Sequence, residues 1–477
     1  MKRWQMTLGL AGAAVIAAAL APRLTAILSG AVAPLPPEPP LPPDPPELAE
    51  VEAPEANIEQ GRLIVDAGLD RPSVLKGTAS ERFLTISVRA PLGEGESVRQ
   101  PVNVAVVMDT SGSMSAAGKI DYAKRAAKQI VRSMGPNDEY SLIAFNDSAR
   151  VIVPATAITD VDRISRQIDR IYEGGGTNLY GGMELGQKEV LDSLDAGDVG
   201  KIVILSDGKA NVGVSDPDSL ARFAAGASAK GIAVTALGLG VDYREDVLAR
   251  IADLGGGNYE FIDDPSQLSA VFEAELQSTT TVVARNTAIT VDLPPEVEPI
   301  EVIGWDAKRT SNGWTIFMGD VQAGAERKIV ARVRVTGHTP GDLDVASARA
   351  DYTDLVDQIQ SQSSDVAVAD ITVDPNRVQA NVDREKAAAA NRAWGNRYLE
   401  MSTRAYEKGD LDTARKMLTE GSGVLRQAAS STGDAKLAED ANALELQLDV
   451  YRDNAPASSG GKRAIKMNKE AYRGAYR

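Results

Sequence analysis

The sequence VVMDTSGSM (106–114) places one carboxylate and two hydroxyls at alternate positions, directly after a run of apolar residues. Asp109, Ser111 and Ser113 are oxygen donors, and oxygen is the ligand type that Mg²⁺ prefers. Gly112 gives the turn between the two serines the backbone freedom that a tight loop needs. A polar turn is the alternative explanation, because Asp, Ser and Gly all favour turns. A cation site therefore requires further oxygen donors from elsewhere in the chain.

Two further oxygen donors occur in comparable segments. Thr177 comes after three glycines in EGGGTNLYGG (173–182), and Asp207 ends the apolar run in VILSDGKAN (203–211). Asp109 or Asp207, taken singly, could be a helix or turn cap. Capping accounts poorly for all of these donors together, so the pattern favours a site for a hard cation.

The segments around these donors alternate short apolar strands with helical stretches. We expect strands at 102–109, 140–145, 150–155, 201–207, 232–240 and 258–262. We expect helices at 119–134, 160–171, 179–194, 217–229, 244–254 and 265–277. Strands this apolar are buried on both faces, which is typical of a parallel sheet covered by helices on each side. Ligands bind such sheets at the carboxyl ends of the strands, where Asp109 and Asp207 stand.

The whole pattern resembles the von Willebrand factor type A (VWA) family over roughly 100–278. The shared features are D-x-S-x-S after a first strand, a Thr in a Gly-rich second loop and an Asp that ends a fourth strand. The resemblance implies a doubly wound, mostly parallel, Rossmann-like α/β domain with a metal-ion-dependent adhesion site (MIDAS). Its members here would be Asp109, Ser111, Ser113, Thr177 and Asp207.

The resemblance also implies how such a site works. The hydroxyls of Ser111, Ser113 and Thr177 would coordinate Mg²⁺ directly, with Mn²⁺ or Ca²⁺ as substitutes, and the two aspartates would bind largely through water. An acidic side chain of a partner protein would then take the open position on the metal. The residues expected to rim the site are Asn178, Tyr180, Lys209 and Asn211.

Composition limits the other classes of function. The net charge of −16 argues against nucleic acid as a partner, because phosphate binding needs a basic face. The chain has no cysteine, which excludes thiol catalysis, Cys-ligated metal centres and disulfides. We find no Walker A loop, zinc motif or nucleophile elbow to accompany the single histidine, His338. We therefore predict a non-enzymatic protein-binding module; an envelope scaffold or assembly factor with a structural or regulatory metal is the alternative.

Segments with alternating apolar residues flank the α/β region on both sides. They lie at 61–70 and 82–91 before it, and at 286–295, 297–305, 313–321, 327–335 and 344–354 after it. The first two are too few to bury a core alone. We therefore expect one β-sandwich, built from 57–99 and 279–375, into which the VWA-like region (100–278) is inserted. This layout loosely resembles exported bacterial VWA proteins and inter-alpha-trypsin inhibitor heavy chains.

The C-terminal part of the chain predicts helices followed by a tail. Residues 376–455 are rich in Ala, Arg, Glu and Leu, and a Gly-Asp break at 409–410 indicates a helical hairpin region. A third helix is expected at about 434–452. Residues 456–477 carry mostly basic charges and are expected to form a flexible tail; contact with an anionic surface is the alternative.

The N-terminal residues have the features of an export signal. Lys2 and Arg3 precede the apolar run 6–21, so 1–33 is expected to be a cleaved signal peptide or an uncleaved membrane anchor. The proline-rich segment 34–56 is expected to be a polyproline II linker, with a ligand for proline-binding domains as the alternative. We therefore expect an exported protein at the periplasmic or extracellular face of the cell envelope, attached to the membrane only if the N-terminal segment is retained.

Overall fold

The computed structural model describes residues 59–92, 99–195, 198–207, 210–241 and 243–475. The expected signal or anchor (1–33) and the expected linker (34–56) lie outside these residues, as does Lys209. Within the described residues, no helix combines the length and the apolar character that crossing a bilayer requires.

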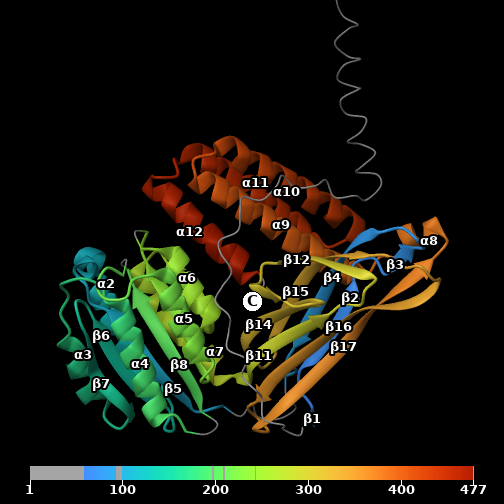
Figure 1. The fold of residues 1–477 in the computed structure, drawn as a ribbon. Helices are drawn as coiled ribbons and strands as arrows, with labels where there is room; N and C mark the ends of the chain where they lie inside the picture. The colour runs from blue at the N-terminus through green and yellow to red at the C-terminus, as the bar shows by residue number, and fades with distance from the viewer. Residues whose placement is uncertain (1–58, 93–98, 196–197, 208–209, 242, 476–477) are drawn as a thin grey trace, which may run out of the picture. The chain divides into compact units, whose positions relative to one another are not determined.

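A six-stranded sheet is the centre of the α/β domain (Figure 1). Its strands lie in the order β10-β9-β8-β5-β6-β7, and all neighbours are parallel except β6 and β7. The strand bounds are β5 Val102–Asp109, β6 Glu139–Phe145, β7 Ala149–Ala157, β8 Val199–Ser206, β9 Ile232–Leu239 and β10 Gly256–Ile262. Every residue of β5, β8 and β9 is buried, because helices cover both faces of the sheet.

Two groups of helices cover the two faces of this sheet. Val106 of β5 belongs to one core with Ile130 and Phe272 of the first group, whereas Val107 belongs to the other core with Met183 of the second group. The first group is α2 Lys119–Ser133, α3 Val161–Asp169 and α7 Leu268–Thr280, and the second is α4 Leu179–Ser193, α5 Pro217–Ser228 and α6 Glu245–Leu254. Short 3₁₀ helices precede α2 (η1, Gly112–Gly118) and α7 (η2, Pro265–Gln267). The doubly wound fold predicted from the sequence is confirmed.

Strands from both sides of the α/β domain form a β-sandwich. The larger sheet has the order β1-β17-β16-β11-β14-β13, with β3 paired to β17, and the smaller sheet has the order β12-β15-β4-β2. The strands before the α/β domain are β1 Glu59–Gln60, β2 Ile64–Leu69, β3 Ser73–Leu75 and β4 Ser80–Arg89. Those after it are β11 Val282–Asp292, β12 Val297–Ile303, β13 Ala307–Arg309, β14 Gly313–Gln322, β15 Glu326–Val335, β16 Gly341–Asp354 and β17 Ile359–Thr372. Because β4 pairs along its whole length with β15, with Ile86 opposite Ile329, the α/β domain is an insertion in the sandwich, as predicted.

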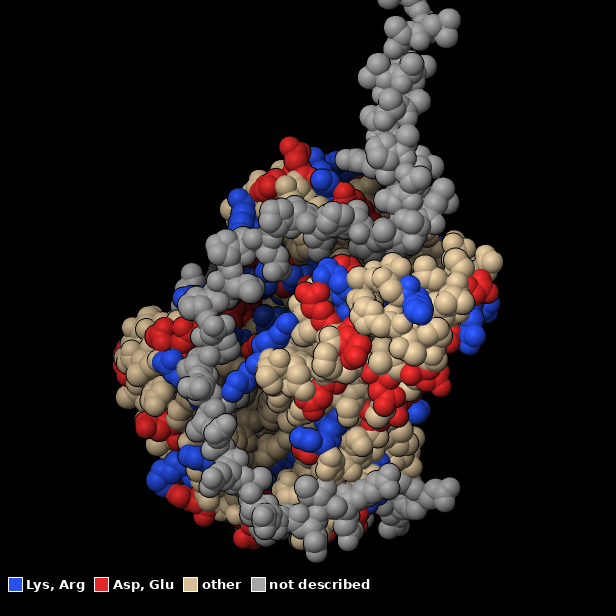
Figure 2. Space-filling model, turned by 45° about the vertical axis from the view of Figure 1, so that its right-hand side comes forward, with Lys and Arg blue, Asp and Glu red and all other residues tan. Residues whose placement is uncertain are grey.

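Charged side chains connect the smaller sheet to its neighbours. Arg332 on β15 pairs with Glu81 of β4 at 2.8 Å and with Glu301 of β12 at 2.7 Å. Its guanidinium also lies 5.0 Å from the ring of Trp394, which belongs to the helical region. Figure 2 shows acidic and basic side chains interspersed over the face that it presents. The charges on this sheet therefore pair with each other and help to dock the C-terminal helices.

The C-terminal helices pack as antiparallel neighbours. Their bounds are α8 Pro375–Ala380, α9 Arg384–Glu407, α10 Leu411–Thr432 and α11 Ala435–Asp453. The chain reverses between α9 and α10 at Gly409, whose φ of 81° favours glycine. Tyr406 at the end of α9 stacks on Tyr451 of α11, with ring centroids 3.8 Å apart. The predicted helical hairpin region is thus present, with a third long helix packed on it.

A further helix, α12 (Ser459–Gly474), forms where we predict a flexible tail over 456–477, so this part of the prediction is wrong. Its basic side chains have acidic partners on the α/β domain: Lys466 and Lys469 each lie 2.8 Å from Glu245 of α6. Burial raises the pKa of Glu245, but hydrogen bonds and charges from the two lysines outweigh that effect and lower it to about 2. A run of basic residues predicts a solvated tail only when no counter-charge is near, and here the counter-charge comes from a distant segment.

Glu470 on α12 is expected to make the stability of the protein depend on pH. Burial raises its pKa from 4.5 to about 7, a hydrogen bond from the Phe261 N–H opposes the rise, and the charge of Glu260 on β10 adds to it. A carboxyl whose pKa is higher in the folded state favours folding when protonated, so it destabilises the protein as the pH rises through that range. Glu470→Gln should therefore raise the melting temperature at pH 8, by an amount that corresponds to about 1 kcal/mol after allowance for solvent screening.

Differential scanning calorimetry of both proteins at pH 5 and at pH 8 measures this difference. The gain should be smaller at pH 5, where Glu470 of the folded wild type is largely protonated. Glu439→Gln, at an exposed position on α11, is a matched control and should change little at either pH. An equal gain of Glu470→Gln at both pH values, or a loss at pH 8, contradicts this account.

Candidate metal centre

Asp109 and Asp207 stand at the same edge of the central sheet. Asp109 is the last residue of β5 and Asp207 directly follows β8, and these strands are parallel neighbours with Met108 opposite Leu205. Parallel neighbours end at the same edge, which places the two carboxylates side by side. Asp109 is 0% exposed and Asp207 is 3% exposed, so neither charge is in free contact with solvent.

A continuous chain of hydrogen bonds joins the two aspartates through the two serines. Asp109 Oδ1 accepts from the Ser111 N–H at 2.8 Å, and the hydroxyl oxygens of Ser111 and Ser113 are 3.1 Å apart. Ser113 Oγ then donates to Asp207 Oδ1 at 2.7 Å. The structure therefore brings these four predicted site residues together as direct neighbours.

The loop that carries Thr177 lies against the same turn. Gly112 N donates to Gly175 O at 3.1 Å, and Gly174 N donates to Thr110 O at 2.8 Å. Gly175 has a φ of 82°, a backbone conformation that residues other than glycine rarely adopt. These contacts bring Thr177, which is 3% exposed, to the edge that holds the two aspartates.

Three of the four predicted rim residues lie in the described part of the chain and have structural partners there. Thr177 N donates to Asn211 Oδ1 at 2.8 Å and Asn211 N donates to Thr177 O at 3.1 Å, so Asn211 holds the Thr177 loop. Asn178 caps α4, because its Oδ1 accepts from Gly181 N at 3.1 Å. Tyr180 packs against an aromatic ring of α5, with ring centroids 5.2 Å apart. These contacts give Asn211, Asn178 and Tyr180 structural roles in the Thr177 loop and in α4.

Two residues that the sequence analysis does not single out bond the same carboxylates. Ser206 Oγ donates to Asp109 Oδ2 at 2.6 Å, and Lys119 Nζ lies 2.5 Å from Asp207 Oδ2. Ser206 could have been found from the sequence, because it directly precedes Asp207 at the end of an apolar strand. Lys119 gives no such signal, because it follows the D-x-S-x-S turn at the start of α2 and only the fold brings it to Asp207.

Burial dominates the electrostatics of this edge. Burial raises the pKa of Asp109 to about 6, hydrogen bonds from Ser206 and Ser111 oppose the rise, and the charge of Asp207 adds to it. A nearby positive charge favours the ionised form of a carboxyl group. A cation bound between the two aspartates therefore removes part of the cost of burying them.

The donor set fits a hard divalent cation. It consists of two carboxylates and three hydroxyls, and oxygen ligands of this kind suit Mg²⁺. Within the described residues, no group of three or more His, Cys, Asp or Glu side chains could hold a metal. A centre at this edge thus depends on its hydroxyl ligands. The candidate ligands remain Asp109, Ser111, Ser113, Thr177 and Asp207.

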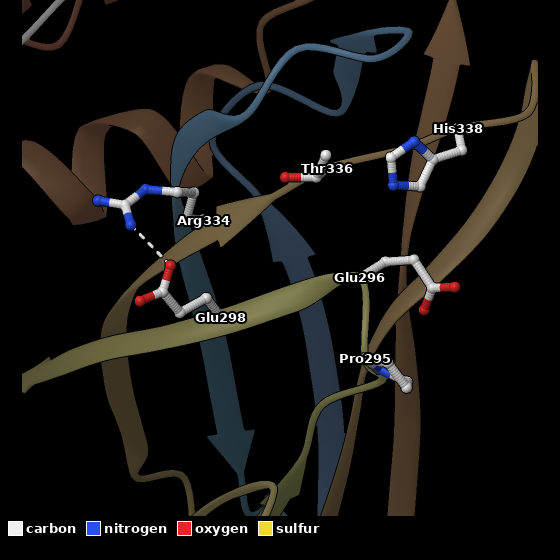
Figure 3. A pocket seen from close by; sticks show the side chains of 6 residues that line it. All are labelled: Pro295, Glu296, Glu298, Arg334, Thr336 and His338. Carbon is white, nitrogen blue, oxygen red and sulfur yellow. Dashed lines mark hydrogen bonds and ion pairs between the residues drawn. The ribbon is translucent and has the colours of Figure 1, made fainter.

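A surface hollow of about 390 Å³ lies on the β-sandwich (Figure 3). Its lining residues are Pro295, Glu296, Glu298, Arg334, Thr336 and His338. Glu298 and Arg334 pair at 2.6 Å, and His338 lies on the other side of the hollow from that pair (Figure 3). The hollow includes none of the candidate metal ligands, so the one histidine of the chain is not part of the site at the sheet edge.

Comparison with known proteins identifies the α/β domain. The profile of the von Willebrand factor type A domain matches residues 103–274. These residues form a VWA domain. VWA domains mediate protein–protein interactions, and they commonly bind a divalent cation through a MIDAS.

Curated relatives share the VWA domain and part of its surroundings. The uncharacterized protein sll0103 of Synechocystis sp. is 26% identical over 307 residues, which are 62% of this chain and 71% of that protein. The uncharacterized protein YfbK of Escherichia coli is 25% identical over 241 residues, 49% of this chain and 42% of that protein. Inter-alpha-trypsin inhibitor heavy chain H4 of Homo sapiens is 28% identical over 250 residues, 50% of this chain and 26% of that protein. The chain therefore spans less than half the length of the last two relatives.

Two solved structures share the fold over most of the chain. A von Willebrand factor type A protein from Catenulispora acidiphila has a TM-score of 0.66 at 17% identity and covers 86% of this chain and 97% of its own. The ArnB paralog VWA2 from Sulfolobus acidocaldarius has a TM-score of 0.58 at 17% identity and covers 87% of this chain and 100% of its own. These likenesses concern the fold alone. They extend well beyond 103–274, so the fold outside the VWA domain is shared as well.

The close approach of α4 to the sheet is expected to contribute to the stability of the folded protein. A Cβ added at Gly182 would lie 2.8 Å from Phe145 and 2.9 Å from Val107, two buried residues of β6 and β5. Gly182→Ala should therefore lower the free energy of unfolding by about 1–2 kcal/mol, because overpacking a filled core outweighs the helix propensity of alanine. Urea unfolding followed by circular dichroism measures the change.

Gly226→Ala in α5 is the matched control. A Cβ at Gly226 has no atom within 4 Å, so this substitution should raise the free energy of unfolding by roughly 0.5–1 kcal/mol through helix propensity alone. If the two alanines change stability in the same direction and by the same amount, the tight contact between α4 and the sheet does not control stability here.

Proposed function

We propose that this protein is a non-enzymatic binding module of the cell envelope, which captures an acidic side chain of a partner protein through Mg²⁺ held by its VWA domain. The observation that carries the proposal is the chain of hydrogen bonds from Asp109 through Ser111 and Ser113 to Asp207, with Thr177 at the same edge. A local polar turn does not explain a bond between Ser113 and Asp207, which are 94 positions apart.

The residues of the site would have different roles. The hydroxyls of Ser111, Ser113 and Thr177 would hold the ion directly, and Asp109 and Asp207 would hold it largely through water. When bound, Mg²⁺ supplies a positive, Lewis-acidic position. Neutral hydroxyls remove less of that charge than carboxylates do, so a carboxylate from a partner makes a strong, charge-assisted contact there. The hydrogen bonds of the two aspartates keep the site in place before a partner arrives.

The placement in the cell envelope is supported by the N-terminal sequence. Lys2 and Arg3 followed by the apolar run 6–21 have the order of charges and apolar residues that export signals have. If that segment is retained as an anchor, the proline-rich segment 34–56 would hold the VWA domain away from the membrane at about 3 Å per residue. The metal-binding edge could then reach a partner on another surface.

An envelope scaffold or assembly factor is the second candidate function. The ion pairs of Lys466 and Lys469 with Glu245 favour the scaffold function, because they hold α12 against the VWA domain. Metal-mediated capture does not require that contact. In this alternative the sandwich and helices bind partners, and the metal has a structural or regulatory role.

Asp109→Ala tests whether this edge binds the metal. A ligand at 100 times its dissociation constant stabilises the folded state by about 2.7 kcal/mol, so wild type should melt several degrees higher with excess Mg²⁺ or Mn²⁺. Asp109→Ala should show no such shift. Ser115→Ala is the control, since Ser115 is exposed close to the same turn and its Oγ donates to a backbone oxygen, Gly112 O, at 2.8 Å. If wild type and Asp109→Ala respond alike, the site is wrongly assigned.

Capture of proteins from an envelope extract, with and without EDTA, separates the two candidate functions. Metal-mediated capture predicts that the same bound protein is lost when EDTA is added and when Asp109→Ala replaces wild type. A protein that stays bound in both cases, while wild type still shows the metal-dependent thermal shift, supports the scaffold instead.

A further inference from the structure

Lys119 places a positive charge inside the candidate metal centre. Its Nζ lies 2.5 Å from Asp207 Oδ2, and the side chains of Lys119 and Asp207 are 16% and 0% exposed, respectively. Ion pairs on a protein surface are open to water and screened by salt. This pair is largely enclosed, so the charge of Lys119 acts on its surroundings with little screening.

The backbone before α2 is arranged so that Lys119 reaches this position. Ala117 and Gly118, the last two residues of η1, have φ values of 54° and 65°, and this left-handed pair directly precedes Lys119 at the start of α2. A residue other than glycine is uncommon in that region. Gly240, directly after β9, lies beside the ammonium, because a Cβ added there would be 3.6 Å from Lys119 Nζ, an ordinary contact distance.

Asp207 divides its two oxygens between two partners. Oδ1 accepts the hydroxyl proton of Ser113 at 2.7 Å, and Oδ2 pairs with Lys119. A lone pair of Ser113 Oγ can face a cation while the hydroxyl proton of Ser113 stays hydrogen-bonded to Asp207 Oδ1. A cation bound at Ser113 and the ammonium of Lys119 therefore share one carboxylate, and the two positive charges repel each other.

We propose that Lys119 is a built-in counter-charge that lowers the affinity of this site for a divalent cation. The inference rests on the proposed function, because it concerns the same site. By neutralising Asp207, Lys119 also leaves less negative charge near the ion, which favours binding of a carboxylate from outside. If Lys119 served only to orient Asp207 for the metal, its removal would weaken metal binding, which is the opposite result.

Isothermal titration calorimetry of the full chain with Mn²⁺ alone tests the proposal. Lys119→Met should bind Mn²⁺ at least about fivefold more tightly than wild type, because the like charge is gone. Lys119→Gln is a second variant that is neutral but can still donate a hydrogen bond to Asp207, and it should show the same gain. Lys124→Met removes an equal charge from the same helix outside the site, and its affinity should stay within about twofold of wild type.

Each outcome has a separate meaning once circular dichroism has confirmed that the variants are folded. Tighter binding by both Lys119 variants, with no change in Lys124→Met, supports the proposal. Unchanged or weaker binding by the Lys119 variants overturns it and leaves the proposed function standing. Binding by the Lys119 variants but not by wild type supports the role of Lys119 as a counter-charge and contradicts the proposed function, because the wild-type site then excludes the ion. If none of these proteins binds Mn²⁺, the proposed function and this inference both fall.

Discussion

The burial of two carboxylates side by side, at one edge of the VWA sheet, is the constraint on which the site depends. Asp109 and Asp207 terminate neighbouring parallel strands, and burying their charges is costly unless partners compensate for the lost water. Ser206 and Ser113 supply hydrogen bonds without charge, and Lys119 supplies one positive charge. Two negative charges and one positive charge leave the edge negative. A divalent cation suits this edge because it brings charge as well as an affinity for the serine and threonine hydroxyls.

The rest of the fold keeps this edge in place. β5 and β8 are buried on both faces, and Asp109 and Asp207 stand where these two strands end. The pairing of β4 with β15 joins strands from before and after the inserted domain. The two ends of the insertion meet where Gln100 N donates to Thr280 O at 3.2 Å. Lys466 of α12 contacts the segment that follows β9 in two ways. It pairs with Glu245, and its Nζ lies 3.6 Å from the centre of the Tyr243 ring. The edge with the candidate metal ligands thus belongs to a domain that contacts both the sandwich and the C-terminal helices.

The parts of this fold that the sequence predicts well are those with a local signal. β5 (Val102–Asp109) and α2 (Lys119–Ser133) follow the expected ranges closely because apolar periodicity over a long segment is read from the segment itself. β17 has no counterpart in the prediction, since IQSQSSD at its start is polar and its pairing with β16 provides the stability. α12 and the Lys119–Asp207 pair were not predictable for a related reason: each depends on an acidic partner far away in the chain. The five candidate ligands were predictable as a set because a family pattern links their separate loops.

The most direct measurement of the central claim is a crystal structure of the protein grown with Mn²⁺, with an anomalous difference map recorded for that ion. Our account predicts one strong peak at the edge formed by Asp109, Ser111, Ser113, Thr177 and Asp207, at about 2.1–2.3 Å from the two serine hydroxyl oxygens. The same map should show Asp109 and Asp207 farther from the peak, with water between. A map without a peak at this edge, although Mn²⁺ is present in excess, would contradict the account, because the buried carboxylates would then be balanced by the protein alone.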